Sequence, residues 1–481
     1  MIPMPAIDLG SISPMIILSL MGMFILVADL FMGRKKGFLA FIALAGLAAA
    51  LVFSCGRETV HAVYSFNGAF VVDKFSLFFN LIFCVSTALV VLISLQYLDR
   101  ENLHLGEYYA LLLFGTVGMM MVAGAADMIM VFLGIEVLSI CLYVLAGMNR
   151  RQPRSAESAM KYFLLGAFAT GFLLYGIALI YGVTGSINFQ KIAEALKDER
   201  LLLSPMLYIG TAFVIIGIGF KAALAPFHQW TPDVYEGAPT TVTAFMAVGP
   251  KAAAIAALFR VLWIPLAAMG EEWKALLWVL AVLTMTVGNV AALAQDNIKR
   301  MLAFSGIAHA GYILVAVITG SKMGSSSVLY YLLAYAFMNI GAFGVVALLG
   351  GKGDEYLNID DYAGMGFKMP GIAFAMSVFM FSMAGIPPLA GFVGKFYIFS
   401  AAVDAGYIGL AIIGVINSVV SAYYYLRVTV VMYMKEPVRG FDGIALKGLP
   451  ILALAISVIG IVYLGVVPAA IMELARQSAI F

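Results

Sequence analysis

Five ionisable side chains lie deep within apolar stretches of this sequence: Glu136, Lys221, Lys251, His309 and Lys395. A charge at the centre of a lipid bilayer opposes insertion by about 2.5 to 3.5 kcal/mol, so such residues are functional by default. Desolvation favours the neutral form of a lysine or a carboxyl group, and a nearby opposite charge reverses that preference. Side chains of these types can therefore bind and release protons near neutral pH when a neighbour approaches or withdraws.

The alternative interpretation of the four lysine and glutamate charges is a set of ion pairs that fix helix register. Three lysines against one glutamate would leave two lysines without a partner, and buried ion pairs are weak stabilisers. We therefore favour a proton path. For His309, a relay and a simple helix–helix hydrogen bond are equally good explanations. Arg260 lies close to a helix end, so we expect its guanidinium to extend to the membrane interface.

The composition demands a membrane environment, because 63% of the 481 residues are hydrophobic and only 11% are charged. A soluble domain carries roughly 25% charged residues. The net charge of +2 is too small for a nucleic-acid binder. Cys55, Cys84 and Cys141 match no disulfide, metal, haem or iron–sulfur spacing, and no strand leads into a glycine-rich phosphate loop. We expect neither a metal nor a redox cofactor in this chain.

About fourteen segments are long and apolar enough to cross a bilayer. Unpaired backbone cannot face lipid, so the predicted fold is an all-α polytopic bundle. The first segment is too long for a signal peptide and is followed by Arg34, Lys35 and Lys36, so we expect it to stay in the membrane. Lysine and arginine are about twice as frequent in the odd-numbered connections, which predicts that both termini lie on the outer side. Between Ser186 and Arg200 the pattern predicts a short amphipathic helix at the outer surface.

Two of the segments are interrupted by proline. Residues 370–403 would form a helix of about 50 Å, and Pro387 and Pro388 lie in its middle. The seventh segment meets Pro226 while still apolar, just after Lys221. Paired interruptions in two halves indicate inverted repeats with an ion site at the breaks.

We accordingly predict peripheral helices in residues 1–105, a first five-helix unit in 106–265, an inverted second unit in 266–435 and a last helix in 436–481. His228 follows the first break. It is expected to cap the broken helix or to border the cytoplasmic entrance, because no second histidine or cysteine nearby would complete a metal site.

Three long motifs resemble the antiporter-like membrane subunits of respiratory complex I and of Mrp-type cation/proton antiporters. They are KAALAPFHQWTPDVYEGAP at 221–239, NIKR at 297–300 with SGIAHAGY at 305–312, and GIPPLAGFVGKFY at 385–397. The resemblance covers the fourth to the thirteenth segment. It implies that Glu136 and Lys221 form a pair, that Lys251 is the central lysine, and that Lys395 lies nearest the outward half-channel.

Within this family the chain is most similar to the N-type subunits of bacterial NADH–quinone oxidoreductase. Lys395 stands where M-type subunits carry a glutamate, and no long lateral helix of the L type follows the fourteenth segment. The resemblance implies a multi-pass protein of the bacterial inner membrane with an M-type subunit and small A-, J- and K-type subunits as neighbours, besides lipids. NADH, FMN, iron–sulfur clusters and quinone are then expected in partner subunits.

These observations favour proton transfer from the cytoplasm through Lys221, Lys251 and His309 to Lys395, driven by NADH oxidation and quinone reduction elsewhere. Two alternatives remain open at this point. The chain could belong to an Mrp-type sodium/proton antiporter, or it could be a structural membrane subunit that does not conduct. The cost of the buried charges argues against the second alternative.

Overall fold

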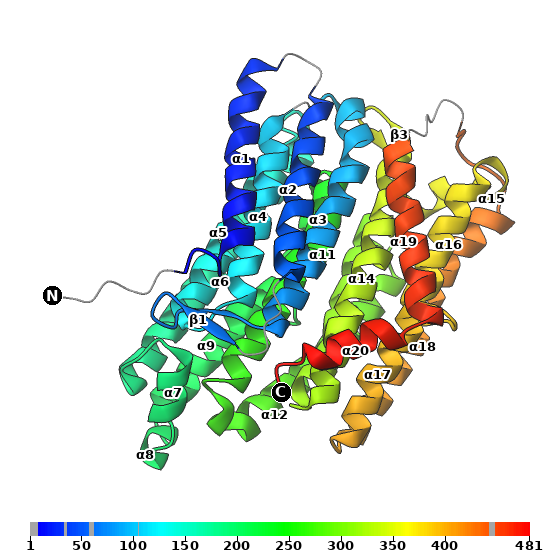
Figure 1. The fold of residues 1–481 in the computed structure, drawn as a ribbon. Helices are drawn as coiled ribbons and strands as arrows, with labels where there is room; N and C mark the ends of the chain where they lie inside the picture. Colours follow the sequence, from blue (N-terminus) through cyan, green and yellow to red (C-terminus); the bar gives the residue numbers. More distant parts are fainter. Residues whose placement is uncertain (1–7, 33–35, 57–61, 104, 442–447) are drawn as a thin grey trace.

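The computed structural model describes residues 8–32, 36–56, 62–103, 105–441 and 448–481, and Figure 1 shows a bundle of long helices. Thirteen helices of this described part are long and apolar enough to cross a membrane. Two shorter helices, α16 and α17, form a further interrupted segment. The prediction of a polytopic helical bundle is confirmed. Arg34 and Lys35, used above to assess the first segment, lie outside the described residues.

The N-terminal part consists of two helices, a hairpin and a third helix. The elements are α1 (Ser13–Phe31), α2 (Gly37–Cys55), β1 (Val63–Ser65), β2 (Phe70–Val72) and α3 (Lys74–Glu101). Asp73 caps α3 by accepting a hydrogen bond from the amide of Ser76, whose hydroxyl accepts one in return from the amide of Asp73. This capping box fixes where the helix begins.

The first predicted unit contains five spanning segments, one of which is broken. Its elements are α4 (Gly106–Ala123), α5 (Met128–Ala146), α6 (Pro153–Thr184), α7 (Phe189–Ala195), α8 (Glu199–Leu202), α9 (Pro205–Ala222), α10 (Trp230–Gly237) and α11 (Thr240–Trp263). The predicted amphipathic segment is present as α7, with Phe189 and Ile192 buried, and is followed by the separate short helix α8.

The second predicted unit repeats this arrangement, and two C-terminal helices follow it. The elements are η1 (Ala267–Met269), α12 (Gly270–Leu293), α13 (Ile298–Ile318), α14 (Lys322–Leu348), β3 (Gly350–Gly351), β4 (Asp354–Glu355), η2 (Ile359–Tyr362), α15 (Met365–Lys368), α16 (Pro370–Ala384), α17 (Ala390–Asp404), α18 (Ile408–Met434), α19 (Gly448–Val466) and α20 (Ala469–Gln477). In Figure 1, α20 lies across the ends of the spanning helices.

Both interrupted segments break in the same way. Helix α9 ends at Ala222, four residues before Pro226, because Ala223 adopts a left-handed conformation with a φ of 60°. Gly385 ends α16 with a φ of 90°. In each case the amide of the following residue donates to a carbonyl near the end of the helix. The amide of Leu224 donates to Gly219, and the amide of Ile386 donates to Phe381. These are Schellman-type ends, which satisfy carbonyls that the broken helix would leave unpaired.

Matching hydrogen bonds also join the loops of the two units. In the first unit, the amide of Met128 donates to the carbonyl of Ile187, and the amide of Phe189 donates to the carbonyl of Ala126. In the second unit, the amides of Ile298 and Ile359 bond in the same way to Leu357 and Asp296. Each residue of the second set lies 170 positions after its counterpart. The two pairs of loops therefore share one hydrogen-bond pattern.

The two ends of the bundle are named here by the hairpins that lie there. The β3 end holds the β3–β4 hairpin and the connections from α3 to α4 and from α12 to α13; the β1 end holds the β1–β2 hairpin, α7, α8 and α20 (Figure 1). Helix α3 is not peripheral: it packs against α11, α14 and α19 and is mostly buried. Helices α1 and α2 remain at one side, with many exposed apolar side chains.

Candidate functional site

The sequence-predicted residues are spread along the length of the bundle. Lys221 lies in the last turn of α9 towards the β3 end, Lys251 and His309 lie midway along α11 and α13, and Lys395 lies in α17 towards the β1 end. All four side chains are almost completely buried, with exposures of 4% or less. Together these four side chains form a row of polar groups within the apolar core.

Aromatic side chains surround the ammonium group of Lys221. Its Nζ donates a hydrogen bond of 3.1 Å to the hydroxyl of Tyr162 and lies 5.8 Å from the ring centre of Tyr143. The Tyr162 ring stacks on Trp230 at 4.5 Å, and the Trp230 indole donates to the carbonyl of Phe220. The first turn of α10 is thereby folded against the end of α9, so the break positions Lys221.

Glu136, in the middle of α5, does not contact Lys221 directly. No ion pair within 4.0 Å joins the two residues in the described part of the chain, and Glu136 Oε1 is buried without a hydrogen-bond partner. A carboxylate oxygen held in this way costs free energy unless it is protonated or finds a donor. The pairing implied by the resemblance is therefore a contact that a movement of α5 or α9 would have to make.

Lys251 bridges the two units. Its Nζ donates a 2.6 Å hydrogen bond to the carbonyl of Gly306 in α13 and lies 5.7 Å from the ring centre of Tyr335 in α14. A Cβ at position 306 would stand 2.8 Å from this Nζ and 3.0 Å from the Tyr335 hydroxyl. Glycine at this position therefore leaves the room that the ammonium group needs.

His309 is held by two tyrosines. Its Nδ1 lies 2.5 Å from the hydroxyl of Tyr331, and its Nε2 lies 2.9 Å from the hydroxyl of Tyr425. Tyr425 also bonds to Ser305, and the His309 ring is 5.1 Å from the ring of Tyr335 beside Lys251. Both ring nitrogens thus face groups that can donate and accept a proton.

Lys395 lies against the break between α16 and α17. Its Nζ donates to the carbonyls of Met383 at 2.9 Å and Ala384 at 3.2 Å and to the hydroxyl of Ser418 at 2.8 Å. It also lies 4.9 Å from the ring centre of Tyr312. The exposed carbonyls at the end of α16 carry the negative end of the helix dipole, which favours a cation there.

A chain of polar side chains connects His309 with Lys395, and the sequence reasoning missed it. The Tyr425 ring packs against Tyr424 at 4.4 Å, and Tyr424 donates to Asn289, which in turn donates to the hydroxyl of Tyr312 at 3.0 Å. Tyrosines in apolar helices are common, and nothing in their spacing along the sequence distinguishes these from ordinary packing residues. Only the fold brings α12, α13, α14 and α18 together around them.

The residues at the first break lie close to a charged surface at the β3 end. Pro226 and His228 are in the connection between α9 and α10, and His228 Nδ1 is buried without a hydrogen-bond partner. Nearby, Asp233 pairs with Lys161 at 2.7 Å and with Arg300 at 2.8 Å. Pro387 and Pro388 occupy the equivalent connection between α16 and α17.

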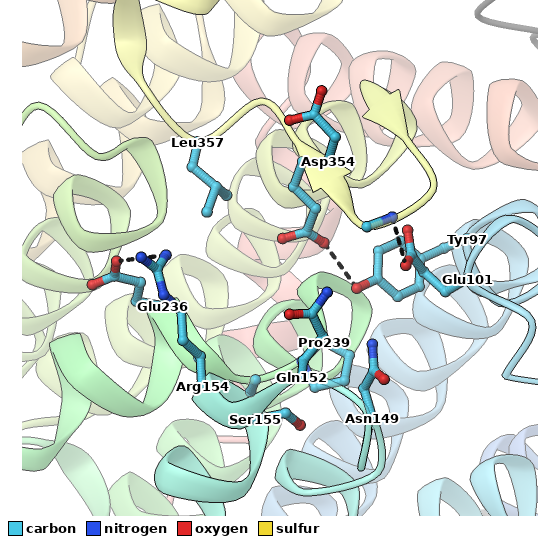
Figure 2. Close-up of a pocket in the computed structure, with 14 residues that line it drawn as sticks. Tyr97, Glu101, Asn149, Gln152, Arg154, Ser155, Glu236, Pro239, Asp354 and Leu357 are labelled. Atoms are coloured by element: carbon cyan, nitrogen blue, oxygen red, sulfur yellow. Dashed lines mark hydrogen bonds and ion pairs between the residues drawn. The ribbon is translucent and has the colours of Figure 1, made fainter.

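A polar cavity of about 330 Å³ opens beside this surface at the β3 end (Figure 2). Its lining includes Tyr97, Arg154, Glu236 and Glu355. The Glu355 carboxylate forms an ion pair of 3.6 Å with Lys299. The side chain of Lys299 is fully buried at the start of α13.

Arg260 is buried, and its guanidinium forms two hydrogen bonds, of 2.7 and 2.8 Å, with the carboxylate of Asp73. Its Nε donates to the carbonyl of Ala123 at 3.0 Å. Burial alone would raise the pKa of Asp73, but Arg260 and the hydrogen bonds from Ser76 outweigh it and lower that pKa below its usual value. Arg260 is thus one half of an ion pair at the β1 end.

Comparison with known proteins places the chain in a family. Residues 125–421 match the family model described as NADH:quinone oxidoreductase/Mrp antiporter, TM. NADH-quinone oxidoreductase subunit N of Trichlorobacter lovleyi is 53% identical over 98% of this chain and 97% of its own length. Subunit N 1 of the same enzyme from Solibacter usitatus is 44% identical over 97% of this chain and 96% of its own length.

Solved structures agree with this assignment. A chain of respiratory complex I from Thermus thermophilus is 34% identical, with a TM-score of 0.81, and the match covers 96% of this chain and 99% of that one. A chain of the Mrp complex from Dietzia shares the fold at 23% identity and a TM-score of 0.82, over 98% and 97% of the two chains.

The class defined by the fold is therefore that of antiporter-like, multi-pass membrane subunits. The chain belongs to the NADH:quinone oxidoreductase/Mrp antiporter transmembrane family. The resemblance to N-type subunits is confirmed by the names of these relatives.

Proposed function

We propose that this chain is a proton-conducting subunit of the membrane arm of a bacterial NADH:quinone oxidoreductase. The observation that carries the proposal is the line of buried proton-binding groups from Lys221 through Lys251 and His309 to Lys395. An apolar bundle has no structural need for lysines that are hydrogen-bonded mainly to carbonyls and hydroxyls, and each one opposes insertion. The tyrosine, serine and asparagine side chains around these residues supply further groups that can donate and accept a proton.

The direction follows from the distribution of basic residues, which favours the β3 end as the cytoplasmic one. Both termini then lie on the outer side of the inner membrane. Protons enter at the surface formed by Lys161, Asp233 and Arg300, reach Lys221, and leave beyond Lys395. His309 serves as the relay between Lys251 and the tyrosine–asparagine chain.

The energy comes from partner subunits. NADH, FMN, iron–sulfur clusters and quinone are bound there, and an M-type subunit and small A-, J- and K-type subunits are the expected neighbours in the membrane. Redox chemistry in those subunits acts on this chain by changing the distance between Glu136 and Lys221. When the Glu136 carboxylate approaches, it stabilises a protonated Lys221; when it withdraws, the proton moves on to Lys251.

Replacing Lys221 by alanine in the assembled complex tests the proposal. Loss of the proton-binding group should lower NADH:quinone activity and proton pumping together by about tenfold or more. NADH oxidation by an artificial acceptor should be unchanged, because that reaction uses only the partner subunits. Pumping is measured in membrane vesicles by the quenching of a pH-sensitive dye.

The matched control is Lys322→Ala, which removes an exposed lysine at the start of α14. This variant should behave as the unmodified complex. Full pumping by Lys221→Ala would refute the proposal.

A further inference from the structure

The buried ion pair between Lys299 and Glu355 has no part in the path described so far. Lys299 is 0% exposed, and its Nζ also donates a 2.7 Å hydrogen bond to the carbonyl of Ala238. Glu355 Oε1 accepts hydrogen bonds of 2.8 Å from both Tyr97 and Thr240. The pair thus ties α13 and the β3–β4 hairpin to α3 and to the start of α11.

Water has access to one side of this pair. Glu355 and Tyr97 line the polar cavity of about 330 Å³ at the β3 end. In Figure 2, the dashed line at the Tyr97 hydroxyl marks the hydrogen bond between them. Burial alone would raise the pKa of Glu355, but Lys299, the two hydroxyl donors and Arg100 lower it below its usual value. The Glu355 carboxylate therefore stays ionised at neutral pH.

The other side of the pair faces Lys251. Lys299 and Gly306, whose carbonyl accepts from Lys251, are seven residues apart and therefore share one face of α13, about 10 Å apart along its axis. Thr240 and Lys251 are eleven residues apart and share one face of α11. The ion pair thus lies on the α11–α13 seam that holds the central lysine.

The seam between the ion pair and Lys251 has an apolar lining. The side chains on these two faces are apolar and fully buried: Ala244, Ala247, Val248, Leu302 and Ala303. The neighbouring Thr243 hydroxyl donates its hydrogen to the carbonyl of Tyr235, so this hydrogen is not directed into the seam. On α14, Asn339 donates to Tyr335 beside Lys251, while its Oδ1 is buried without a partner. This unpartnered acceptor lies one turn of α14 from Tyr335, whose ring is beside Lys251.

We propose that the Lys299–Glu355 pair is a barrier that separates the polar cavity at the β3 end from Lys251. With the pair intact, cytoplasmic water stops at Glu355, and protons reach Lys251 only through Lys221. With the pair broken, an uncompensated charge remains in the seam and draws water into it. A second route from the cytoplasm to Lys251 then opens, and protons flow back through Lys395. This inference rests on the proposed proton path.

The test is the passive proton permeability of the complex in liposomes, followed with an entrapped pH dye after an imposed pH step and without NADH. Glu355→Gln should raise the leak at least about fivefold, because the buried ammonium of Lys299 loses its counter-charge. NADH:quinone activity should stay within about twofold of the unmodified rate, while fewer protons are pumped per NADH. The matched control is Asp360→Asn, which breaks the exposed pair with Lys435 at the same end.

Two further variants identify the route of the leak. Lys299→Met combined with Glu355→Gln removes both charges and should close the seam again. Lys395→Ala combined with Glu355→Gln should abolish the leak, because the route runs through Lys395. Should Glu355→Gln fail to assemble, Glu355→Asp carries the test, since it keeps the charge but shortens the reach and should leak to a smaller extent.

An unchanged leak in an assembled Glu355→Gln complex overturns the inference. Lower turnover with an unchanged leak also overturns it, because Glu355 would then be a proton entrance. Failure of the underlying function looks different: Lys221→Ala would pump normally. If only the barrier is wrong, Lys221→Ala loses pumping and Glu355→Gln does not leak.

Discussion

The proposed role of His309 rests on the contacts of its two ring nitrogens. An isolated histidine in an apolar helix is equally well explained as a packing residue, but here each ring nitrogen faces a tyrosine hydroxyl. A proton accepted at one nitrogen can be released from the other, provided that both hydroxyls remain. The proposed relay therefore requires Tyr331 and Tyr425 as much as the imidazole.

Replacing Tyr425 by phenylalanine should break the relay while keeping the ring. The variant removes the hydroxyl that contacts both His309 and Ser305, so proton pumping and NADH:quinone activity should fall together by roughly threefold to tenfold, the lower value applying if water takes the place of the hydroxyl. Tyr330→Phe is the control, because its buried hydroxyl bonds to the carbonyl of Leu464, away from the path. Equal activity of the two variants would exclude a relay through Tyr425.

The sequence predicted the lysines of this site but not the groups around them. A lysine in an apolar segment is conspicuous because its insertion is costly. Tyr331, Tyr425 and Asn289 carry no such cost, so only their three-dimensional positions reveal them. The burial of Lys299 and Arg260 could not be predicted for a related reason: residues near helix ends are usually exposed, and the carboxylate partners of these two residues come from loops that are distant in the sequence.

At the level of elements, α11 contains a proline without interruption, and the structure explains how. Pro250 has no amide hydrogen, so the carbonyl of Met246, four residues earlier, loses its usual helical partner. The hydroxyl of Tyr235 in α10 donates to that carbonyl at 3.1 Å. The predicted segments and both breaks could be found from apolar length and proline positions, whereas this repair between helices could not, because it depends on how α10 folds back.

The contribution of the hydrogen bond from Tyr235 to the Met246 carbonyl can be measured with a double-mutant cycle. Tyr235→Phe should leave the Met246 carbonyl buried and unpaired, which costs about 1 to 3 kcal/mol. Pro250→Ala restores the amide of residue 250, so the same tyrosine substitution should cost much less in that background. The readout is the thermal stability of the detergent-extracted complex. Equal losses in both backgrounds would show that Tyr235 stabilises the fold in another way.

At the scale of the whole molecule, α3 links the two units. Its start holds Arg260 of the first unit through Asp73, and near its end Tyr97 holds Glu355 of the second unit. One helix thereby carries a buried polar contact at each end of the bundle. The arrangement fixes the two units against each other, so that Lys251 in α11 meets the carbonyl of Gly306 in α13.

The contact at the β1 end should contribute strongly to the stability of the assembly. Asp73→Asn removes the charge that neutralises Arg260, whose side chain is only 3% exposed. Leaving such a charge uncompensated costs about 3 to 5 kcal/mol, so the complex should lose its quinone reductase activity at a distinctly lower temperature. Asp198→Asn is the control at the same end, because Asp198 pairs with an Arg200 side chain that is 89% exposed, and such exposed pairs contribute little to stability. If both variants lose activity at the same temperature as the unmodified complex, the Arg260–Asp73 pair does not stabilise the contact of α3 with the first unit. The contact between Lys251 and Gly306 must then be maintained by apolar packing alone.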